Sequence, residues 1–321
     1  NKKYLFFSHT IKKQPYNQTL LQEVIKKKIQ LIDYETLKLK DGKRVVAFGR
    51  WAGIVGAYNA LLTYGKKHKL YNLKPAHECY DLKELKLELR SVKLPAVKIL
   101  LTGTGRVSKG AMEILTAVNI KEITPDLFLS NEFNEAVYAI VDSHDYNEHQ
   151  KGEVFNFKDF YKNPSYYKGT FTRFIPDTDI LIAGAYWDPN APILFSDEDV
   201  KKSNFKMDVV ADITCDIKGS IATTIRPSTI ADPSYDVSRS TLKEEKVYSK
   251  KKNTTVMAVD NLPCELSRDA SESFGRQLID NVVENLFRTD NGLIARASIT
   301  SLEGDLTDNF EYLRDYLQGE A

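Results

Sequence analysis

The sequence predicts an α/β protein in which short apolar strands alternate with helices. The clearest strand is the run Val97–Leu101, and the glycine-rich turn Gly103-x-Gly105 follows it almost at once. After that turn, the apolar residues of Ala111–Val118 recur at the spacing of a helix face. The chain has 321 residues, which suits two domains of ordinary size.

Six apolar runs in the middle and later parts of the chain have the pattern of β-strands. Helical or loop stretches separate most of them, as the crossovers between parallel strands require. Each crossover is expected to be right-handed. The runs therefore predict one mostly parallel sheet, formed by Val97–Leu101, Asn119–Ile123, Val137–Val141, Ile180–Ala183, Val209–Ile213 and Thr255–Val259.

The N-terminal part has the same alternation on a smaller scale. Tyr4–Ser8 is expected to form a strand, Asn17–Lys28 an amphipathic helix and Ile29–Tyr34 a second strand. The dipeptide Asp41-Gly42 is typical of a tight turn, and Arg44–Phe48 is expected to form a further strand after it.

Two helices and one long loop are predicted between and within these regions. A helix from Gly49 to about Tyr64 is lined with small residues, which permit close approach of another element or of a ligand. Asp81–Val92 has the pattern of a charged amphipathic helix. Ile221–Asn253 is rich in Pro, Ser and Thr, and a loop of that length is usually functional or mobile.

The C-terminal part contains the clearest helix of the chain. Leu266–Asp269 supplies capping residues, and apolar side chains then recur every four positions. Gly292–Thr300 is expected to add a strand and Asp308–Leu317 a short terminal helix. The recurring apolar residues are Phe274, Leu278, Val282 and Leu286.

Composition and charge bear on the class of partner. With 45 basic and 44 acidic residues the net charge is +1, so we expect neither nucleic acid nor a membrane surface as a partner. We expect no membrane span, which needs roughly 18 apolar residues, and no signal peptide. The three cysteines, Cys79, Cys215 and Cys264, are widely spaced, and reduced thiols in a cytoplasmic protein are their simplest explanation. An oligomer is compatible with the sequence.

The strand, glycine turn and helix around Gly103 indicate a nucleotide pyrophosphate site. Glycines let backbone N–H groups approach phosphates, and the positive end of the helix dipole faces them. The spacing Gly103-x-Gly105 fits a dinucleotide fingerprint, but the third small residue falls at Val107/Ser108 or at Gly110. A strand–turn–helix with incidental glycines remains the alternative at this point.

Six stretches taken together resemble the saccharopine dehydrogenase (lysine-forming) and lysine–2-oxoglutarate reductase family. That family is related to alanine dehydrogenase and to one domain of the nicotinamide nucleotide transhydrogenase. The resemblance runs from about residue 4 to about residue 290. The stretches are Phe7–Gln14, Ala47–Gly53, Gly103–Gly110, Ala211–Asp216, Val259–Pro263 and Asp269–Phe274.

The resemblance implies two Rossmann-like domains with parallel sheets and a cleft between them. Residues 1–62 plus 265–321 would form a discontinuous substrate domain, and 63–264 the dinucleotide-binding domain. The implied reaction is reversible: saccharopine, NAD(P)+ and water give lysine, 2-oxoglutarate and NAD(P)H through an imine. The chain begins Asn-Lys-Lys-Tyr and runs directly into a strand. We therefore expect the N-terminal part of the first domain, with the family's lysine base, to lie outside it.

The resemblance also assigns residues of the substrate site. His9 matches the family's catalytic histidine, and histidine exchanges protons near neutral pH; a hydrogen-bonding histidine at a strand end is the alternative. Lys12 and Gln14 match positions that line the substrate pocket, although Lys12 and Lys13 could equally form a solvated pair. Arg50 could hold a substrate carboxylate, or its glycine neighbours could serve packing alone.

Further residues are expected at the cofactor. Asp260 follows a strand and matches the family aspartate near the nicotinamide, with a helix cap as the alternative; Asp212 ends another strand in a similar position. Gly103, Gly105, Arg106 and Val107 are expected to hold the dinucleotide. We expect an acid for the adenosine ribose about 20 residues after the glycines.

Glu122 and Asp126 bracket that position, although Thr124-Pro125 occupies much of the strand end, and Glu122 is the residue assigned to the ribose. Arg106 could bind a 2′-phosphate or could equally contact the pyrophosphate. The choice between NAD and NADP stays open. Asp142, His144, Asp145 and His149 lack the spacing of a metal site, and no metal is expected. The rivals are an alanine dehydrogenase-like enzyme and a catalytically silent dinucleotide-binding protein; all three take a small molecule as partner.

Overall fold

The computed structural model describes residues 2–319, which divide into two compact units. Unit 2 runs from Phe48 to Ala270, and unit 1 holds the described residues before and after it. These boundaries differ from the predicted division into 1–62 plus 265–321 and 63–264. The physical reason is helix α2 (Gly49–His68), which belongs wholly to unit 2 because it packs along α4 (Arg106–Ala117) and against the sheet.

Unit 2 is built around a mostly parallel sheet of eight strands in the order β11-β10-β12-β9-β8-β3-β5-β4. All six predicted strands are present, and each pairs in parallel with its neighbours among the six. The predicted α/β class is therefore confirmed. The six are β3 (Lys98–Thr102), β4 (Lys121–Ile123), β5 (Val137–Val141), β8 (Ile180–Ala183), β9 (Val209–Asp212) and β12 (Thr254–Met257).

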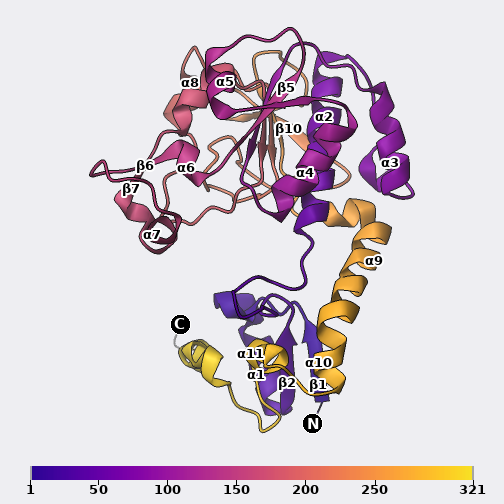
Figure 1. The fold of residues 1–321 in the computed structure, drawn as a ribbon, viewed down its shortest axis with the longest axis vertical. Helices are drawn as coiled ribbons and strands as arrows, with labels where there is room; N and C mark the ends of the chain where they lie inside the picture. Colours follow the sequence, from indigo (N-terminus) through magenta and orange to yellow (C-terminus); the bar gives the residue numbers. More distant parts are fainter. Residues whose placement is uncertain (1, 320–321) are drawn as a thin grey trace. The chain divides into compact units, whose positions relative to one another are not determined.

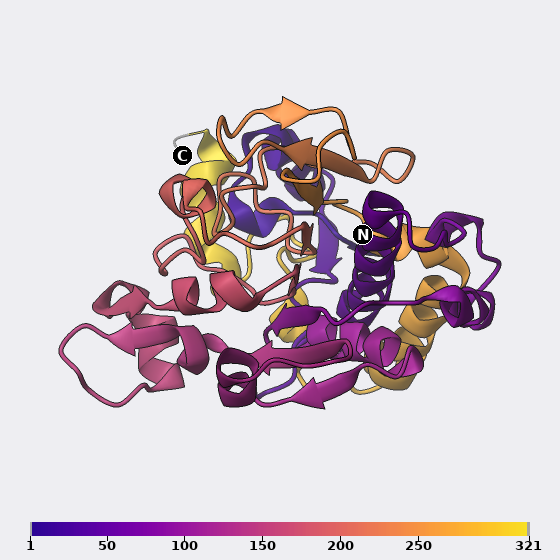
Figure 2. The ribbon, with the colours of Figure 1, turned by 90° about the horizontal axis from the view of Figure 1, so that it is seen from above.

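Two further strands lie inside the segment that the sequence predicts as a long loop. β10 (Ser234–Val237) pairs antiparallel with β12, and the short β11 (Glu244–Glu245) pairs antiparallel with β10. Figure 2 shows this segment in orange at one margin of the sheet, with the magenta strands at the other. A small hairpin, β6 (Asn147–His149) with β7 (Tyr167–Gly169), is also absent from the sequence prediction.

The strands of the sheet are apolar on both faces because each face carries a core. Ile99 and Leu101 of β3 belong to the cluster under α2 and α4, whereas Leu100 belongs to the cluster on the opposite face. In Figure 1, α2 and α4 lie side by side. The other helices of unit 2 are α3 (Leu82–Glu88), α5 (Pro125–Ser130), α6 (Ser143–Tyr146), α7 (Phe157–Lys162) and α8 (Asp197–Lys201).

The small residues at the start of α2 allow close packing on α4. A Cβ placed on Gly53 would lie 1.8 Å from the carbonyl oxygen of Val107, and one on Gly110 would lie 2.0 Å from the carbonyl oxygen of Arg50. No side chain fits at either position without moving a backbone. The sequence allows these small residues to approach either another element or a ligand. The structure shows that they approach another element, helix α4.

Unit 1 contains a β–α–β unit in which β1 (Lys2–Phe6) and β2 (Ile29–Asp33) pair in parallel and α1 (Gln18–Lys26) connects them. Its C-terminal part adds a long helical segment and two short helices. Its core is formed by residues from both parts of the chain, such as Leu31 and Leu313. The helical elements are α9 (Ser267–Leu278), a π-helical turn (Ile279–Val283), α10 (Glu284–Phe287), α11 (Leu293–Ala297) and α12 (Arg314–Gln318).

Two predicted strands of unit 1 are wrong. Arg44–Phe48 makes only one isolated bridge, between Arg44 and Lys38, although its apolar residues are buried. Gly292–Thr300 begins instead as α11, because the Asp290 carboxylate accepts hydrogen bonds from two backbone N–H groups of its first turn. The end of this segment does pair, because Ser298 forms an isolated antiparallel bridge with Ile32 of β2 and Thr300 forms one with Leu306. In Arg44–Phe48, burial accounts for the apolar pattern.

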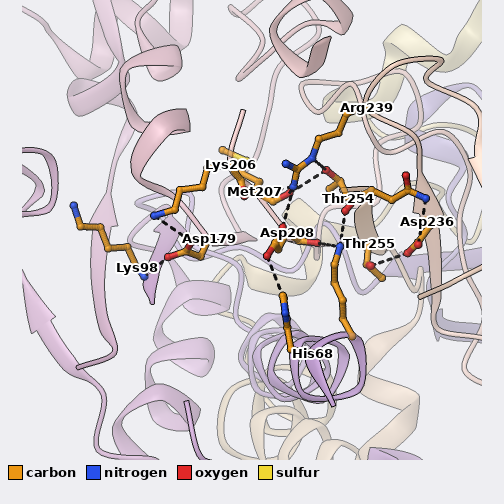
Figure 3. Close-up of polar contacts among 12 residues, drawn as sticks. His68, Lys98, Asp179, Lys206, Met207, Asp208, Asp236, Arg239, Thr254 and Thr255 are labelled. Atoms are coloured by element: carbon orange, nitrogen blue, oxygen red, sulfur yellow. Dashed lines mark hydrogen bonds and ion pairs between the residues drawn. The ribbon is translucent and has the colours of Figure 1, made fainter. Parts of the chain in front are cut away.

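A polar network occupies the amino edge of the sheet in unit 2 (Figure 3). The Asp208 carboxylate lies 3.0 Å from the Arg239 guanidinium and 3.1 Å from the His68 imidazole. Lys67 Nζ donates to the backbone carbonyls of Asp208 and Asn253, and burial lowers its pKa to about 8. The network joins α2 to β9, β10 and β12 at the edge opposite to the one where open α/β sheets bind ligands, so we interpret it as structural.

A buried acid, Glu265, lies in the 3₁₀ turn Leu262–Leu266, which packs on α2 just before α9. Its carboxylate accepts a hydrogen bond of 2.9 Å from Asn59, and burial raises its pKa to about 7. The folded state therefore holds a proton between about pH 4.5 and 7 that the unfolded chain has lost, so stability falls as the pH rises through that window.

We predict that Glu265→Gln removes this loss, because glutamine keeps the acceptor for Asn59 and does not ionise. The wild-type free energy of unfolding should fall by up to about 3 kcal/mol between pH 5 and pH 8 through this residue alone. Urea unfolding of both proteins at the two pH values measures the difference. Glu78→Gln, at an exposed neighbouring acid, is the control, and equal pH dependence in all three proteins would contradict the prediction.

Candidate active site

The glycine-rich turn lies at the carboxyl edge of the sheet in unit 2, between β3 and α4. Gly103 has a φ of +89°, and a Cβ there would lie 3.0 Å from Cα of Ala185, so the turn needs glycine at this position. Gly105 precedes the first turn of α4 in extended conformation, and a Cβ there would meet no atom within 4 Å. The N-terminus of α4 is therefore open to an anionic ligand on the side of Gly105.

Hydrogen bonds to the neighbouring strands hold this turn in place. The N–H of Gly103 donates to the carbonyl oxygen of Val141 over 2.7 Å, and Ser108 Oγ donates to the carbonyl oxygen of Thr102 over 3.0 Å. Thr102 Oγ1 in turn accepts the N–H of Gly184. The turn is thus fixed before a ligand binds, which lowers the entropy lost on binding.

Arg106 and Val107, the first residues of α4, have different surroundings. Arg106 is exposed, so its guanidinium is accessible at the open end of the helix. Val107 is half-buried, with its backbone against Gly53 and its side chain beside Gly184. The structure thus gives Val107 a packing role, and only Arg106 is placed to meet a ligand through its side chain.

The acid beside the glycine turn is Asp142, which is not among the residues predicted from the sequence to contact the cofactor. It ends β5, the strand next to β3, and its carboxylate accepts hydrogen bonds from Thr104 Oγ1 (2.9 Å) and from the N–H of Ser143 (2.7 Å). The predicted acid, Glu122, lies on the edge strand β4, two strands away from the turn, and accepts a hydrogen bond from Tyr138. The prediction for Glu122 assumes that β4 lies beside β3, and the strand order is different.

An aromatic cavity of about 260 Å³ lies next to Asp142. Ser143 from the end of β5 and Ala185 from the end of β8 line it, together with the side chains of Tyr146, Tyr186 and Trp187. Ala185 is also the residue against which Gly103 packs. The cavity therefore adjoins the glycine turn, and its aromatic walls suit a flat, apolar group.

The two aspartates predicted at other strand ends, Asp212 and Asp260, differ in whether their carboxylates are available to a ligand. Asp212 is fully buried, and its two carboxylate oxygens accept hydrogen bonds from Thr214, Cys215 and Thr224, so it stabilises the loop after β9. Its prediction as a cofactor ligand is not supported by these contacts. Asp260 is exposed and makes no hydrogen bond within the described residues, so it remains available to a ligand.

Arg50, predicted as a substrate anchor, already has a carboxylate partner. Its guanidinium forms a bidentate pair with Glu113 of α4, with N···O distances of 2.6 and 2.7 Å, and this pair raises the pKa of Arg50. This bidentate pair occupies the guanidinium N–H groups that would otherwise bind a substrate carboxylate. Arg50 therefore ties α2 to α4 in this structure.

His9 of unit 1 lies in the turn directly after β1, with a φ of 53°. The buried Asp33 holds this turn by accepting hydrogen bonds from the N–H and the hydroxyl of Ser8. The same carboxylate accepts the N–H of Glu35 over 2.7 Å, so one buried acid positions both His9 and Glu35. His9 is a non-glycine residue in the left-handed region, and such strain is common at functional sites.

Glu35 faces the imidazole of His9 and was not predicted from the sequence. The distance between His9 Nδ1 and Glu35 Oε2 is 3.6 Å, and this oxygen is buried without a hydrogen-bond partner among the described residues. A carboxylate in this position faces Nδ1 and can orient the imidazole ring. Its place directly after a predicted strand was the available signal.

Lys12 and Gln14 lie close to His9 along the chain. Lys12 is exposed and forms no ion pair within the described residues, whereas Lys13 pairs with Asp315 over 2.8 Å. The two lysines thus do not form the solvated pair that was the alternative. Gln14 Oε1 accepts a hydrogen bond from Tyr16, which orients its amide.

The described residues contain no group of three or more His, Cys, Asp or Glu side chains that could hold a metal ion. None of their helices is both long and apolar enough to cross a membrane.

The fold and the glycine turn define a Rossmann-like α/β protein with a site for an anionic ligand at the end of its central strand. The chain belongs to the alanine dehydrogenase/PNT family, because the family's C-terminal domain matches residues 132–303, more than half of the chain. The resemblance drawn from the sequence is thereby confirmed.

Relatives of known identity are moderately similar. The mitochondrial alpha-aminoadipic semialdehyde synthase of Mus musculus is 29% identical over 98% of this chain, which spans only 39% of that protein. The saccharopine dehydrogenase [NAD(+), L-lysine-forming] of Emericella nidulans is 25% identical over 88% of this chain and 68% of its own length. A solved structure of L-alanine dehydrogenase has a TM-score of 0.58 and 14% identity, covering 100% of this chain and 77% of that one, which shows the shared fold alone.

Proposed function

We propose that this chain is the catalytic part of an NAD(P)-dependent oxidoreductase that acts on the C–N bond of saccharopine or a close relative. The reaction is reversible and converts saccharopine, NAD(P)+ and water into lysine, 2-oxoglutarate, NAD(P)H and a proton. The observation that carries the proposal is the pairing of His9 with Glu35 in a turn that the buried Asp33 fixes. Saccharopine is chosen as the substrate because the similar proteins include an alpha-aminoadipic semialdehyde synthase and a saccharopine dehydrogenase.

Unit 2 is the proposed dinucleotide-binding unit. The open space at Gly105 and the N-terminus of α4 suit a pyrophosphate, Asp142 suits a ribose hydroxyl, and the aromatic cavity suits the adenine ring. When bound, the nicotinamide supplies or accepts a hydride. Asp260, exposed after β12, is available to contact the nicotinamide end.

Unit 1 supplies the proton chemistry in this proposal. Making or hydrolysing an imine requires proton transfer at the amine nitrogen and at the carbinolamine oxygen. His9 is the proposed acid and base for these steps, because its half-exposed ring is accessible while Glu35 holds its other side. Lys12 would attract a carboxylate of the dicarboxylic substrate, and Gln14 would donate a hydrogen bond to it.

An absorbance assay of NADH and NADPH oxidation by the full-length protein tests this proposal. Turnover that requires both lysine and 2-oxoglutarate supports the saccharopine reaction. Turnover with pyruvate and ammonia instead assigns an alanine dehydrogenase-like activity. Dinucleotide binding without either reaction would leave a silent binding protein and reject the proposed catalysis.

We predict that the protein prefers NADH to NADPH because of Asp142. A carboxylate at the end of the neighbouring strand accepts ribose hydroxyls and repels a 2′-phosphate. Asp142→Asn should lower the preference by about tenfold or more, equal to about 1.4 kcal/mol, by removing the charge while keeping the shape of the cap. The dissociation constants of both dinucleotides, with and without the substitution, measure this effect.

Glu122→Gln is the matched control, since it neutralises the acid that lies at the predicted sequence distance. It should leave the preference unchanged, because Glu122 lies on the edge strand β4 and accepts a hydrogen bond from Tyr138 of β5, away from the glycine turn. A shift in Glu122→Gln with none in Asp142→Asn would restore the assignment made from sequence spacing.

A further inference from the structure

A hollow of about 360 Å³ in unit 1 has no part in the proposed reaction. It lies among the segment after β2, α11 and the C-terminal 3₁₀ turn Asp308–Leu313. Its walls combine apolar groups with cations, and no acidic side chain is among the described residues that line it. The residues that matter here are Ile11, Lys38, Lys40, Arg296, Phe310 and Tyr312.

The cations of this hollow differ from their neighbours in being without carboxylate partners. Lys43 pairs with Asp41, and Arg314 pairs with Asp305 and Glu311. In contrast, no ion pair among the described residues involves the three cations of the hollow, which are Lys38, Lys40 and Arg296. Three like charges around one hollow repel each other, and an anion between them would relieve that repulsion.

Arg296 is the most confined of these cations. One terminal nitrogen donates to the carbonyl oxygen of Lys38 over 3.3 Å, while Nε is buried without a hydrogen-bond partner among the described residues. A guanidinium has five N–H donors, so most of them remain uncommitted. Arg296 is therefore held near the hollow with donors to spare for an oxyanion.

The hollow is connected to the turn that carries His9. Tyr312 lines it, and the hydroxyl of Tyr312 donates to the carbonyl oxygen of Ile11 over 3.1 Å. Ile11 also lines the hollow and belongs to the 3₁₀ turn Thr10–Lys12, which follows His9 directly. A ligand that orders Tyr312 would thus also restrain this turn.

We propose that this hollow binds a small organic anion, with its carboxylate or phosphate on Lys38, Lys40 and Arg296 and its apolar body against Phe310 and Tyr312, and that binding stiffens the turn Thr10–Lys12. The volume lies within the range of small-molecule sites. The site is separate from the residues assigned to the reaction. A negative result for this site would therefore not contradict the proposed function, and a negative result for the proposed function would not contradict this site.

Titration with 4-fluorobenzoate, followed by ¹⁹F NMR, and with phenyl phosphate, followed by calorimetry, tests the site at physiological ionic strength without dinucleotide. Both should bind saturably, and at least about tenfold more tightly than inorganic phosphate or 4-fluorobenzyl alcohol. Inorganic phosphate supplies the anionic group alone, and 4-fluorobenzyl alcohol supplies the aromatic ring alone. Tighter binding of the benzoate would assign a carboxylate ligand, and tighter binding of phenyl phosphate a phosphorylated one.

Lys38→Met and Arg296→Met should each weaken binding about tenfold or more, the effect of losing one charge-assisted contact. Lys27→Met, at an exposed lysine directly after α1 in the same unit, is the control and should not change it. Because Lys38 is exposed, its substitution should not disturb folding. Absence of saturable binding, or equal weakening in Lys27→Met, would overturn the site.

Hydrogen exchange tests the connection to the turn. Saturating 4-fluorobenzoate should slow amide exchange in residues 10–13 of the wild type. In Tyr312→Phe the anion should still bind, but the slowing should be lost because the bond to Ile11 is gone. Unchanged exchange in the wild type at saturation would overturn the proposed stiffening, whatever the protein's catalytic activity.

Discussion

Gly105→Val is expected to abolish dinucleotide binding while leaving the fold intact. A Cβ at this position meets no protein atom within 4 Å, so a side chain would point into the open space before α4. That space is where backbone N–H groups must approach a pyrophosphate. We expect affinity for NADH to fall by about 100-fold or more, or about 2.7 kcal/mol. Energy transfer to bound NADH from Trp187, which lines the adjoining cavity, provides the measurement.

Two other glycines give this prediction its controls. Gly275 is also open, with no atom within 4 Å of a Cβ, but it lies on α9, so Gly275→Val should leave NADH binding unchanged. Gly103 has a positive φ and packs on Ala185, so Gly103→Val should lower the thermal midpoint as well as the affinity. Wild-type affinity in Gly105→Val would exclude this turn as the pyrophosphate site.

The sheet of unit 2 could be predicted from the sequence because its strands are buried on both faces. A run such as Val137–Val141 is apolar without interruption, and few other structures produce such runs between helices. Arg44–Phe48 has a similar apolar content and is no strand, because its residues are buried by packing alone. Strand pairing is a long-range property that a short apolar run does not reveal.

The order of the strands in the sheet could not be predicted from the spacing of residues in the sequence. The rule that places a ribose acid about 20 residues after the glycines assumes that the second strand lies beside the first. In this chain β5 takes that place and β4 forms the edge, so Asp142 lies beside the glycine turn and Glu122 does not. The antiparallel β10 was missed for a related reason, since its partner β12 follows only after a long connection.

Chain position indicates which residues lie near a strand end, but it does not reveal the partners of their side chains. His9 and Gly105 lie shortly after strands, and the carboxyl edge of a parallel sheet exposes such residues. Asp212 also ends a strand, but three neighbours on its own loop bind its carboxylate. Arg50 likewise meets Glu113 from a helix that starts more than 50 residues later. Such partners cannot be read from one sequence.

His9→Gln is expected to lower kcat for saccharopine formation by about 100-fold or more, which is the usual contribution of a general acid or base. Glutamine keeps a hydrogen-bonding group of similar length but cannot exchange a proton at neutral pH. The affinity for NADH, which unit 2 is proposed to bind, should not change. Steady-state assays with lysine and 2-oxoglutarate, together with NADH titrations, separate the two quantities.

Glu35→Gln distinguishes a positioning role from simple support of the fold. Removing the carboxylate 3.6 Å from His9 Nδ1 leaves the imidazole without the group that faces and orients it, so kcat should fall while the affinity for NADH stays unchanged. A merely structural role would lower the thermal midpoint together with the activity. His144→Gln, at an exposed histidine of unit 2, is the control for the loss of an imidazole elsewhere. Near-normal turnover in His9→Gln would remove this histidine from the reaction, and Glu35 would then be only a buried acid beside a turn.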